Sequence, residues 1–332
     1  MKAALLLKPG PVETQPLVLT DYPAPEPGPK EILIRVKACG LCHTDLHTVE
    51  GELPLPKLPL IPGHQIVGVV ERKGKEARRY EEGDRVGVPW LFSTCGKCEY
   101  CREGNENLCE NARFTGLHVN GGYAQYCVAS PDFAYPIPAE YPDPQAAPLL
   151  CAGIIGYRAL RLSGVKPGER LGLYGFGASA HISIQIAIHW GCEVYAFTRS
   201  EEHRALAKSL GAAWAGNAEG EPPKKLHSAI LFAPAGKLVP EALRVLRKGG
   251  TVALAGIHMS PIPEMAYSLI YQERGVRSVA NSTRRDAQEL LSLAPKIPIR
   301  TEVEAFPLEL VNKALALLKE SRIKGAGVLT IP

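Results

Sequence analysis

Residues 170–190 read RLGLYGFGASAHISIQIAIHW, and this stretch decides the fold of the second half of the chain. Residues 170–174 predict a short β-strand, and the apolar run 181–190 predicts a helix. Between them, Gly175, Gly177 and Ala180 follow the spacing G-x-G-x-x-A. In this spacing the first glycine permits a tight turn, the second lets the backbone approach a pyrophosphate, and the alanine allows the helix to pack closely on the strand. The stretch therefore predicts a dinucleotide-binding turn, with a packing turn that binds no cofactor as the alternative.

The end of the next expected strand, 193–197, bears on which dinucleotide binds. NAD-binding turns usually have an acidic residue there, about 20 residues after the first glycine. This chain has Thr198, Arg199 and Ser200 instead. A guanidinium and two hydroxyl groups suit a 2′-phosphate, so the sequence favours NADP(H). The alternative is that Arg199 is an ordinary solvated residue and that the cofactor is NAD. The expected cofactor-binding residues are Gly175, Phe176, Gly177, Ala178, Ala180, Thr198, Arg199 and Ser200.

Strands and helices alternate through the region around this turn. Further elements are expected at 193–197 (strand), 201–210 (helix), 229–232 (strand), 239–246 (helix) and 251–255 (strand), with a turn at Gly249-Gly250. Such alternation predicts a parallel sheet with right-handed crossovers. We expect this α/β domain to span residues 152–285.

The first part of the chain differs in composition and pattern. Residues 1–151 are rich in proline and glycine and contain short strand-like runs, such as 32–36 and 66–70. They predict a mostly-β domain with long loops. The last segment, 286–332, contains an expected helix at 308–321 and a strand at 327–331. The pattern alone leaves open whether this segment closes the second domain or returns to the first.

Length and composition limit the function classes. The chain has 332 residues, of which 45% are hydrophobic and 22% charged, and a net charge of +4 that is spread along the sequence. This composition predicts a globular chain with about two domains and no nucleic-acid-binding stripe. The longest nearly apolar stretch, 146–157, is about 12 residues, short of the roughly 20 that span a membrane. The N-terminal apolar run is too short for a secretory signal, so we expect a cytoplasmic location.

Nine cysteines are unusual in such a chain, and four of them are clustered. Cys95, Cys98, Cys101 and Cys109 follow C-x2-C-x2-C-x7-C within the lobe 93–112. Four thiolates complete a tetrahedral zinc site and leave no open position, which is typical of a structural zinc. An iron–sulfur cluster and four free cysteines are the alternatives. We read Cys39, Cys127 and Cys192 as buried thiols that bind no metal.

Three other residues could form a second metal site. Cys42, His64 and Cys151 offer two thiolates and one imidazole, which would leave a fourth position on zinc open for a substrate. A single cysteine is usually a small buried hydrophobe, and a single histidine is usually a hydrogen-bonded core residue. The spacing of these three residues therefore leaves the site undecided.

Several motifs together resemble the zinc-dependent medium-chain alcohol dehydrogenases. These motifs are GLCHTDLH (40–47), PGHQIVG (62–68), CGKCEYCREGNENLC (95–109), LLCAGIIGY (149–157) and the glycine-rich turn, followed by FPLELVNKALALLKESRIKGAGVL (306–329). They occur in the family's order over nearly the whole chain. The resemblance implies a GroES-like catalytic domain (1–151), a doubly wound Rossmann cofactor domain (152–285), a cleft between them, and a C-terminal segment that returns to the catalytic domain.

The resemblance also implies roles for individual residues. Cys42, His64 and Cys151 would hold the catalytic zinc, and Asp45 would orient the ligating histidine. Thr44 would hydrogen-bond the substrate oxygen, and His47 would end a proton relay; a helix N-cap and a surface residue are the respective alternatives. His43 matches a basic position near the cofactor pyrophosphate. The apolar residues Leu53, Trp90, Phe92 and Leu117 match the substrate pocket, which favours an uncharged alcohol, although core packing is as good a reading of each.

Two residues depart from the family pattern. Gln65 stands where the family usually has a glutamate near the zinc, and the lost negative charge predicts a more electrophilic metal and a lower pKa of the bound alcohol or water. Ala326 stands where many relatives have an arginine that contacts the cofactor phosphate, which puts that contact in doubt.

The expected protein is a zinc-dependent oxidoreductase that transfers a hydride between an alcohol/aldehyde pair and a nicotinamide cofactor, with two zinc ions per chain. A polyol dehydrogenase of the same superfamily is one alternative, but such enzymes tend to use a carboxylate where this chain has Cys151. A zinc-free quinone reductase would lack both cysteine sets. A non-catalytic, zinc-stabilised binding protein is the alternative from another class. We expect a homodimer or homotetramer, because relatives form these.

Overall fold

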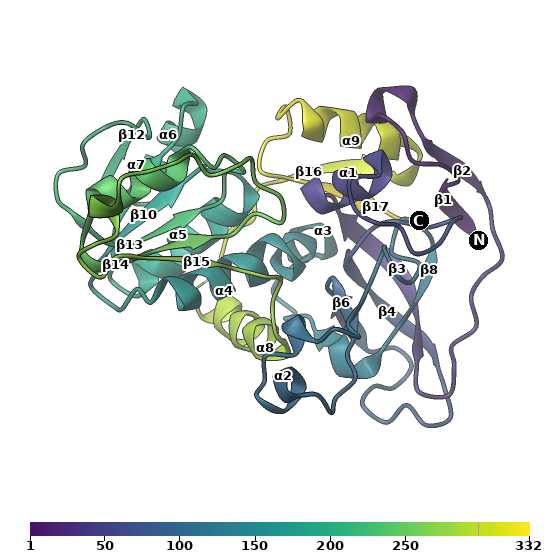
Figure 1. Ribbon diagram of the computed structural model, residues 1–332. Helices are drawn as coiled ribbons and strands as arrows, with labels where there is room; N and C mark the ends of the chain where they lie inside the picture. The colour runs from purple at the N-terminus through teal and green to yellow at the C-terminus, as the bar shows by residue number, and fades with distance from the viewer. Residues whose placement is uncertain (298) are drawn as a thin grey trace. The chain divides into compact units, whose positions relative to one another are not determined.

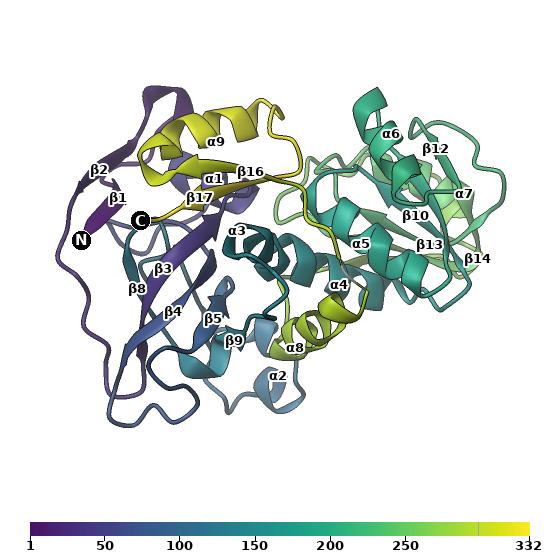
Figure 2. The same cartoon turned by 180° about the vertical axis from the view of Figure 1, so that it is seen from behind.

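The computed structural model describes residues 1–297 and 299–332 and divides into two compact units. Unit 1 comprises Met1–Cys151, Thr283–Ser292 and Arg300–Pro332, and unit 2 comprises Ala152–Ser282 and Leu293–Ile299. Figure 1 labels the elements of both units, and Figure 2 shows them from behind.

The second change of unit occurs earlier than the expected boundary at 285/286. Unit 1 resumes at Thr283, whose backbone N–H donates to Asp286 Oδ2 at 2.8 Å and whose hydroxyl donates to the same oxygen at 2.7 Å. This pair of hydrogen bonds opens helix α8 (Arg284–Leu293), so the whole start of the helix belongs to unit 1.

Unit 2 is built on a six-stranded sheet. The order is β12-β11-β10-β13-β14-β15, and each neighbouring pair is parallel. The strands are β10 (Arg170–Tyr174), β11 (Glu193–Phe197), β12 (Trp214–Gly216), β13 (Leu226–Leu231), β14 (Leu246–Leu254) and β15 (Gly275–Ser278). In chain order this is 3-2-1-4-5-6, the doubly wound Rossmann arrangement, with its switch point at β10.

Helices cover both faces of this sheet. Figures 1 and 2 show α4 (Ala152–Ser163) and α5 (Ala178–His189) on one face and α7 (Leu238–Val245) on the other. The remaining elements of unit 2 are α6 (Glu201–Ser209), η5 (Tyr267–Leu269) and η6 (Ala294–Lys296). The core is apolar and fully buried, and within it Tyr174 and Phe197 stack with ring centroids 4.1 Å apart.

The sequence reading of unit 2 was wrong at one turn and incomplete at two strands. Gly249 and Gly250 lie inside β14 rather than in a turn, where Gly249 adopts φ +69° and the register with β13 shifts. A glycine absorbs such an irregularity because it has no Cβ to clash. Strands β12 and β15 were missed because they are short edge strands with little apolar pattern.

Unit 1 contains a seven-stranded sheet. Its main order is β16-β17-β3-β4-β5-β9, and β8 also pairs with β3. The strands are β16 (Val303–Pro307), β17 (Ala326–Thr330), β3 (Ile32–Gly40), β4 (Gln65–Lys73), β5 (Arg85–Val88), β9 (Tyr135–Pro136) and β8 (Tyr126–Ala129). Two small sheets join β1 (Lys2–Leu6) to β2 (Leu17–Asp21) and β6 (Leu91–Ser93) to β7 (Arg113–Phe114).

The helices of unit 1 are short. They are α1 (His43–Glu50), α2 (Glu99–Arg102), α3 (Asp143–Ala146), α8 and α9 (Val311–Lys319), with 3-10 turns η1 (Val12–Thr14), η2 (Glu106–Leu108), η3 (Pro131–Phe133), η4 (Ala147–Leu150) and η7 (Leu308–Leu310). The C-terminal strand β17 pairs antiparallel with β3, with Leu329 opposite Cys39. This pairing answers the question left open by the pattern, because the C-terminal segment joins the sheet of unit 1.

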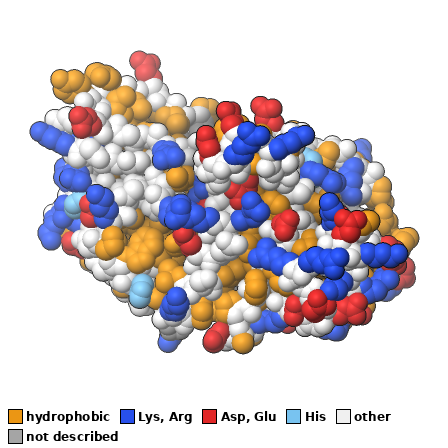
Figure 3. Space-filling model, turned by 90° about the horizontal axis from the view of Figure 1, so that it is seen from below, with side chains coloured by type: hydrophobic (Ala, Val, Ile, Leu, Met, Phe, Trp, Pro, Cys, Tyr) orange, Lys and Arg blue, Asp and Glu red, His pale blue; other side chains and the backbone are white. Residues whose placement is uncertain are grey.

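The surface is mixed in charge. On the face shown in Figure 3, lysine and arginine side chains are interspersed with aspartate and glutamate. Among the described residues, no helix combines the length and apolar character needed to cross a bilayer.

Candidate metal centres and cofactor turn

Cys42, His64 and Cys151 come together in unit 1. Cys42 Sγ lies 3.3 Å from His64 Nε2 and 3.8 Å from Cys151 Sγ, and the three donor atoms lie within 4.8 Å of one another. Tetrahedral zinc places two thiolate sulfurs about 3.8 Å apart and a sulfur and a nitrogen about 3.6 Å apart. The donor set therefore fits zinc in both chemistry and spacing.

Different elements position the three donors. Cys42 is the N-cap of α1, directly after β3, and Cys151 follows the buried turn η4. His64 immediately precedes β4 and follows Gly63, which has φ +98°. A Cβ at Gly63 would lie 2.5 Å from the Tyr123 ring and 2.9 Å from Cys39 Sγ, so only glycine fits this turn before the ligand.

Asp45 is buried beside Cys42, His64 and Cys151, here called the trio, and hydrogen-bonds two of them. It is 2% exposed, and its carboxylate accepts from the backbone N–H of Cys42 at 2.9 Å and from Nδ1 of His64 at 3.0 Å. A proton on Nδ1 leaves Nε2, the nitrogen beside Cys42, free to bind a metal. The structure thus brings Asp45 to the position that the resemblance implied.

Neighbouring groups shift the pKa values of Cys42 and His64. The hydrogen bond with Cys151, followed by burial, raises the pKa of the Cys42 thiol well above its usual range. Burial is the largest influence on His64 and lowers its pKa, but the negative charges of Asp45 and Cys42 and the hydrogen bonds with both together hold this pKa well above its usual range. Without a bound cation, Cys42 and His64 therefore keep their protons. A bound metal ion would displace these protons from the ligand atoms.

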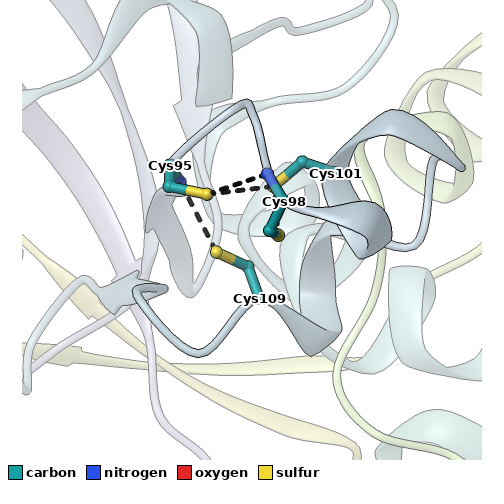
Figure 4. Close-up of side chains that lie close together, drawn as sticks. All are labelled: Cys95, Cys98, Cys101 and Cys109. Carbon is teal, nitrogen blue, oxygen red and sulfur yellow. Dashed lines mark hydrogen bonds between the residues drawn. The ribbon is translucent and has the colours of Figure 1, made fainter.

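The four clustered cysteines also converge (Figure 4). Their sulfur atoms lie within 4.8 Å of one another, with Cys95 Sγ 3.9 Å and Cys98 Sγ 3.5 Å from Cys101 Sγ. Backbone N–H groups at Cys95 and Cys98 point at Cys109 Sγ and Cys95 Sγ, at 3.5 and 3.4 Å. N–H groups that point at sulfur favour thiolates, and four thiolates near 3.8 Å apart suit a closed tetrahedral site.

A residue that the sequence reading missed anchors this lobe. Glu106 is 3% exposed, and its Oε1 accepts from the backbone N–H and from Nε of Arg284, at 2.9 and 3.1 Å. Arg284 also lies over the Phe133 ring, 5.2 Å from its centroid. The pairing joins positions 178 residues apart, so no local pattern could have indicated it.

The glycine-rich turn of unit 2 has the expected geometry. Gly175 has φ +83°, and a Cβ there would lie 2.9 Å from the backbone N of Ala233. Gly177 is the N-cap of α5, a Cβ there would meet nothing within 4 Å, and Ala180 is fully buried. Ala178 begins α5, and Phe176 is buried. The N-terminus of α5 is thus accessible to an anion at Gly177.

The three residues after β11 have different surroundings. Arg199 is exposed, whereas Thr198 is 9% exposed and its backbone N–H donates to Gly216 O at 2.9 Å. Ser200 is the N-cap of α6, and its hydroxyl accepts from the His203 N–H at 3.3 Å. A capping hydroxyl can still donate its own proton, so Ser200 keeps one hydrogen bond for a ligand.

The other predicted residues cluster around α1 and the start of β4. His43, Thr44 and His47 lie on α1, and Nδ1 of His47 contacts the Glu52 carboxylate, a partner that the sequence reading missed. Gln65 is 2% exposed, and its Nε2 has no hydrogen-bond partner among the described residues. Ala326 is a buried residue of β17, with its N–H bonded to Glu302 O at 2.9 Å.

The four apolar residues that were expected to line the substrate pocket have different surroundings. The Trp90 ring lies 6.2 Å from the His64 ring, and Leu53 follows α1 with its N–H 3.4 Å from His47 O. Leu117 is buried. Phe92 instead packs under Arg113, whose guanidinium carbon lies 5.6 Å from its ring centroid.

Two protein-family models match the chain. Residues 28–139 match the alcohol dehydrogenase GroES-like domain, and residues 180–296 match the zinc-binding dehydrogenase domain. The chain is 46% identical over 337 residues to the probable alcohol dehydrogenase AdhA of Mycobacterium tuberculosis, covering 100% of this chain and 97% of that one. It is 40% identical over 310 residues to an alcohol dehydrogenase of Geobacillus stearothermophilus, covering 91% of each.

Solved structures share the architecture. A cobalt- and zinc-bound thermostable alcohol dehydrogenase from Pyrobaculum aerophilum superposes with a TM-score of 0.91 and 27% identity, over 99% of both chains. Both the sequence similarity and the structural similarity extend over essentially the full length.

Proposed function

Because this chain belongs to the zinc-dependent medium-chain alcohol dehydrogenase family, we propose that both cysteine-rich sites bind zinc and that Cys42, His64 and Cys151 form the catalytic one. The chain is an oxidoreductase of alcohols and aldehydes. The observation that carries the catalytic assignment is the convergence of two thiols and one imidazole on donor spacings that suit zinc, from segments 22 and 109 residues apart.

The proposed roles of the chain's residues follow from their positions. Bound zinc would supply Lewis-acid polarisation of the substrate oxygen, and the nicotinamide would exchange the hydride. Asp45 holds His64 in the tautomer that presents Nε2. Thr44, in the first turn of α1, would hydrogen-bond the substrate oxygen, and the alcohol proton would leave through a relay that runs by way of the cofactor ribose and ends at His47.

Metal analysis combined with turnover tests this proposal. Two zinc ions per chain and reversible oxidation of an alcohol are expected. One zinc per chain and no turnover would favour the zinc-stabilised binding protein. A polyol dehydrogenase is less well supported, because the third ligand position holds Cys151 rather than a carboxylate; a panel of simple alcohols and polyols separates the two.

We also propose that NADP(H) is preferred over NAD(H). The exposed guanidinium of Arg199 and the remaining hydrogen-bond capacity of Ser200 support a 2′-phosphate site at the end of β11. The ratio of kcat/KM for the two cofactors tests this, with Arg199→Gln expected to lower the value for NADPH by about tenfold and to spare NADH. Equal or better activity of the wild type with NADH would defeat the proposal.

A homodimer or homotetramer is part of the proposal. Strand β15 ends the sheet of unit 2, and the exposed apolar residues Val276, Tyr267 and Tyr271 lie on it and on the chain just before it. An unpaired edge with apolar side chains is suited to pairing with a second copy. Sedimentation of the wild type and of Val276→Lys tests this. The cytoplasmic location stays a prediction, which cell fractionation would check.

A further inference from the structure

A pocket of unit 1 is lined by residues other than the proposed metal ligands. It has a volume of about 340 Å³. It is lined by the chain before β3, the paired strands β6 and β7, the segment at Lys57, residues 118–120 and strand β8. The lining residues on which the argument rests are Tyr22, Lys57, Phe92, Arg113, His118 and Tyr126.

Positive charge in this pocket exceeds negative charge. Lys57 and Arg113 are its cations, and neither forms an ion pair among the described residues. The one acidic residue in the lining, Glu31, already accepts the Gly28 N–H at 2.9 Å through its Oε2. The pocket therefore holds two cationic side chains and a single carboxylate, and a bound anion would balance the remaining positive charge.

The positive charge of Arg113 also affects the pKa values of its neighbours in the pocket. Burial and then the charge of Arg113 lower the pKa of Lys57, and the same two causes in the same order lower the pKa of His118. His118 is therefore neutral near pH 7 and offers hydrogen bonding rather than charge. Its Nδ1 is buried and has no partner among the described residues.

Each cationic side chain has one contact with a neighbouring side chain. Lys57 Nζ donates to Asn120 Oδ1 at 2.8 Å, and the same oxygen accepts the Ile61 N–H at 3.3 Å. The Arg113 guanidinium lies over the Phe92 ring, 5.6 Å from its centroid. Because these contacts restrict both side chains, less conformational entropy is lost when an anion binds.

The rest of the lining is apolar or aromatic. Tyr22, Pro23 and Pro25 come from one segment, and Tyr126 and Val128 from β8. A pocket with a few fixed polar groups and apolar walls is typical of sites for small organic molecules. We propose that this pocket binds a small organic anion, whose carboxylate or phosphate contacts Arg113 and Lys57 and whose apolar body lies against Tyr22 and Tyr126.

Calorimetric titration of the zinc-loaded enzyme tests the proposal with three probes of similar size: benzoate, phenyl phosphate and the uncharged benzamide. Benzoate or phenyl phosphate is expected to bind at least about tenfold more tightly than benzamide, because hydrogen bonds to an ionised acceptor are stronger than those to a neutral amide. The stronger of the two anions tells whether a carboxylate or a phosphate is the better ligand. Equal binding of benzamide, or no binding of either anion, overturns the proposal.

Two variants locate the binding. Arg113→Gln is expected to weaken the anion at least about tenfold, because it removes one of two cations in the pocket. Arg322→Gln is the matched control, since Arg322 is exposed and pairs with Glu320, and it should leave anion binding unchanged. Alcohol turnover should be unaffected in both variants.

Two outcomes would contradict this assignment. The first is equal weakening by the two variants. The second is a change in sedimentation of Arg113→Gln without any loss of anion binding, which would assign the cationic pocket to contact with another copy of the chain. Neither outcome depends on whether the trio is the catalytic zinc site, so failure of this proposal and failure of the proposed function are distinguishable.

Discussion

The two cysteine sets of unit 1 differ in how the chain assembles them. Cys95 and Cys109 are 14 residues apart, whereas Cys42 and Cys151 are 109 residues apart. Between Cys95 and Cys109 the buried residues are Glu106 and Asn107, both polar. The trio, in contrast, lies next to β3 and β4, whose apolar side chains belong to a large core, and next to η4, all of whose residues are buried.

A bound metal would therefore have a different role at each of the two sites. The four-cysteine lobe has no apolar core of its own, so binding energy of a metal becomes folding energy there. The trio is positioned by a sheet that has a large apolar core of its own, so we expect a metal there to contribute chemistry more than structure. Four substitutions test whether the two sites differ in this way.

The largest effect is expected from Cys42→Ser. Loss of one thiolate of the trio should lower kcat/KM by about a thousandfold or more, because polarisation of the substrate oxygen contributes several kcal/mol. The midpoint of thermal unfolding should change little. Cys39→Ser is the control, since Cys39 is a buried thiol three residues earlier that joins neither set. Comparable activity of the two variants would remove the trio from catalysis.

Cys98→Ser should have the opposite signature. The zinc content should fall from two to one per chain, and Tm should fall by about 5 °C or more, because several kcal/mol are lost at roughly 2–4 °C per kcal/mol. Alcohol turnover at low temperature should remain measurable. Cys192→Ser, a buried thiol of unit 2, is the control for the substitution. Unchanged metal content in Cys98→Ser would show that this set holds no zinc.

Asp45→Asn should have an intermediate effect. An amide at this position makes a weaker hydrogen bond to Nδ1 of His64, which is expected to reduce zinc affinity of the trio by about 10–100-fold. Competition with a chelator measures the affinity, and the four-cysteine set provides an internal reference within the same chain. Asp132→Asn, an exposed aspartate, controls for the lost charge. Equal loss of both zinc ions would mean that Asp45 stabilises unit 1 rather than one ligand.

Gln65→Glu should have the smallest effect. The new carboxylate would be buried next to the trio and should raise the pKa of the alkaline limb of the kcat/KM profile by about one pH unit, since negative charge disfavours loss of a proton nearby. Gln125→Glu, the same change at a residue that bonds the Lys2 N–H, is the control. An alkaline limb that stays in place or moves to lower pH contradicts the role assigned to Gln65.

Some of the fold was predictable because its signals are local. The limits of β10 and β11 were predicted to the residue, and α5 was predicted except for its first three residues, which follow directly on Gly177. Strand–turn–helix units depend on neighbouring residues, so a short window contains the information. The edge strand β15 has no such signal, because pairing with β14 rather than its own pattern makes it a strand.

The sequence by itself determined the pattern of the four clustered cysteines, the glycine turn and the family resemblance, since each depends on residues that are close along the chain. Only the tertiary structure decided that Glu106 meets Arg284 and that Phe92 lies under Arg113, and it supplied the register of β17 on β3. These contacts join residues far apart in the sequence. Which distant residues meet is decided by how the whole sheet buries its apolar side chains, and no local window contains that information.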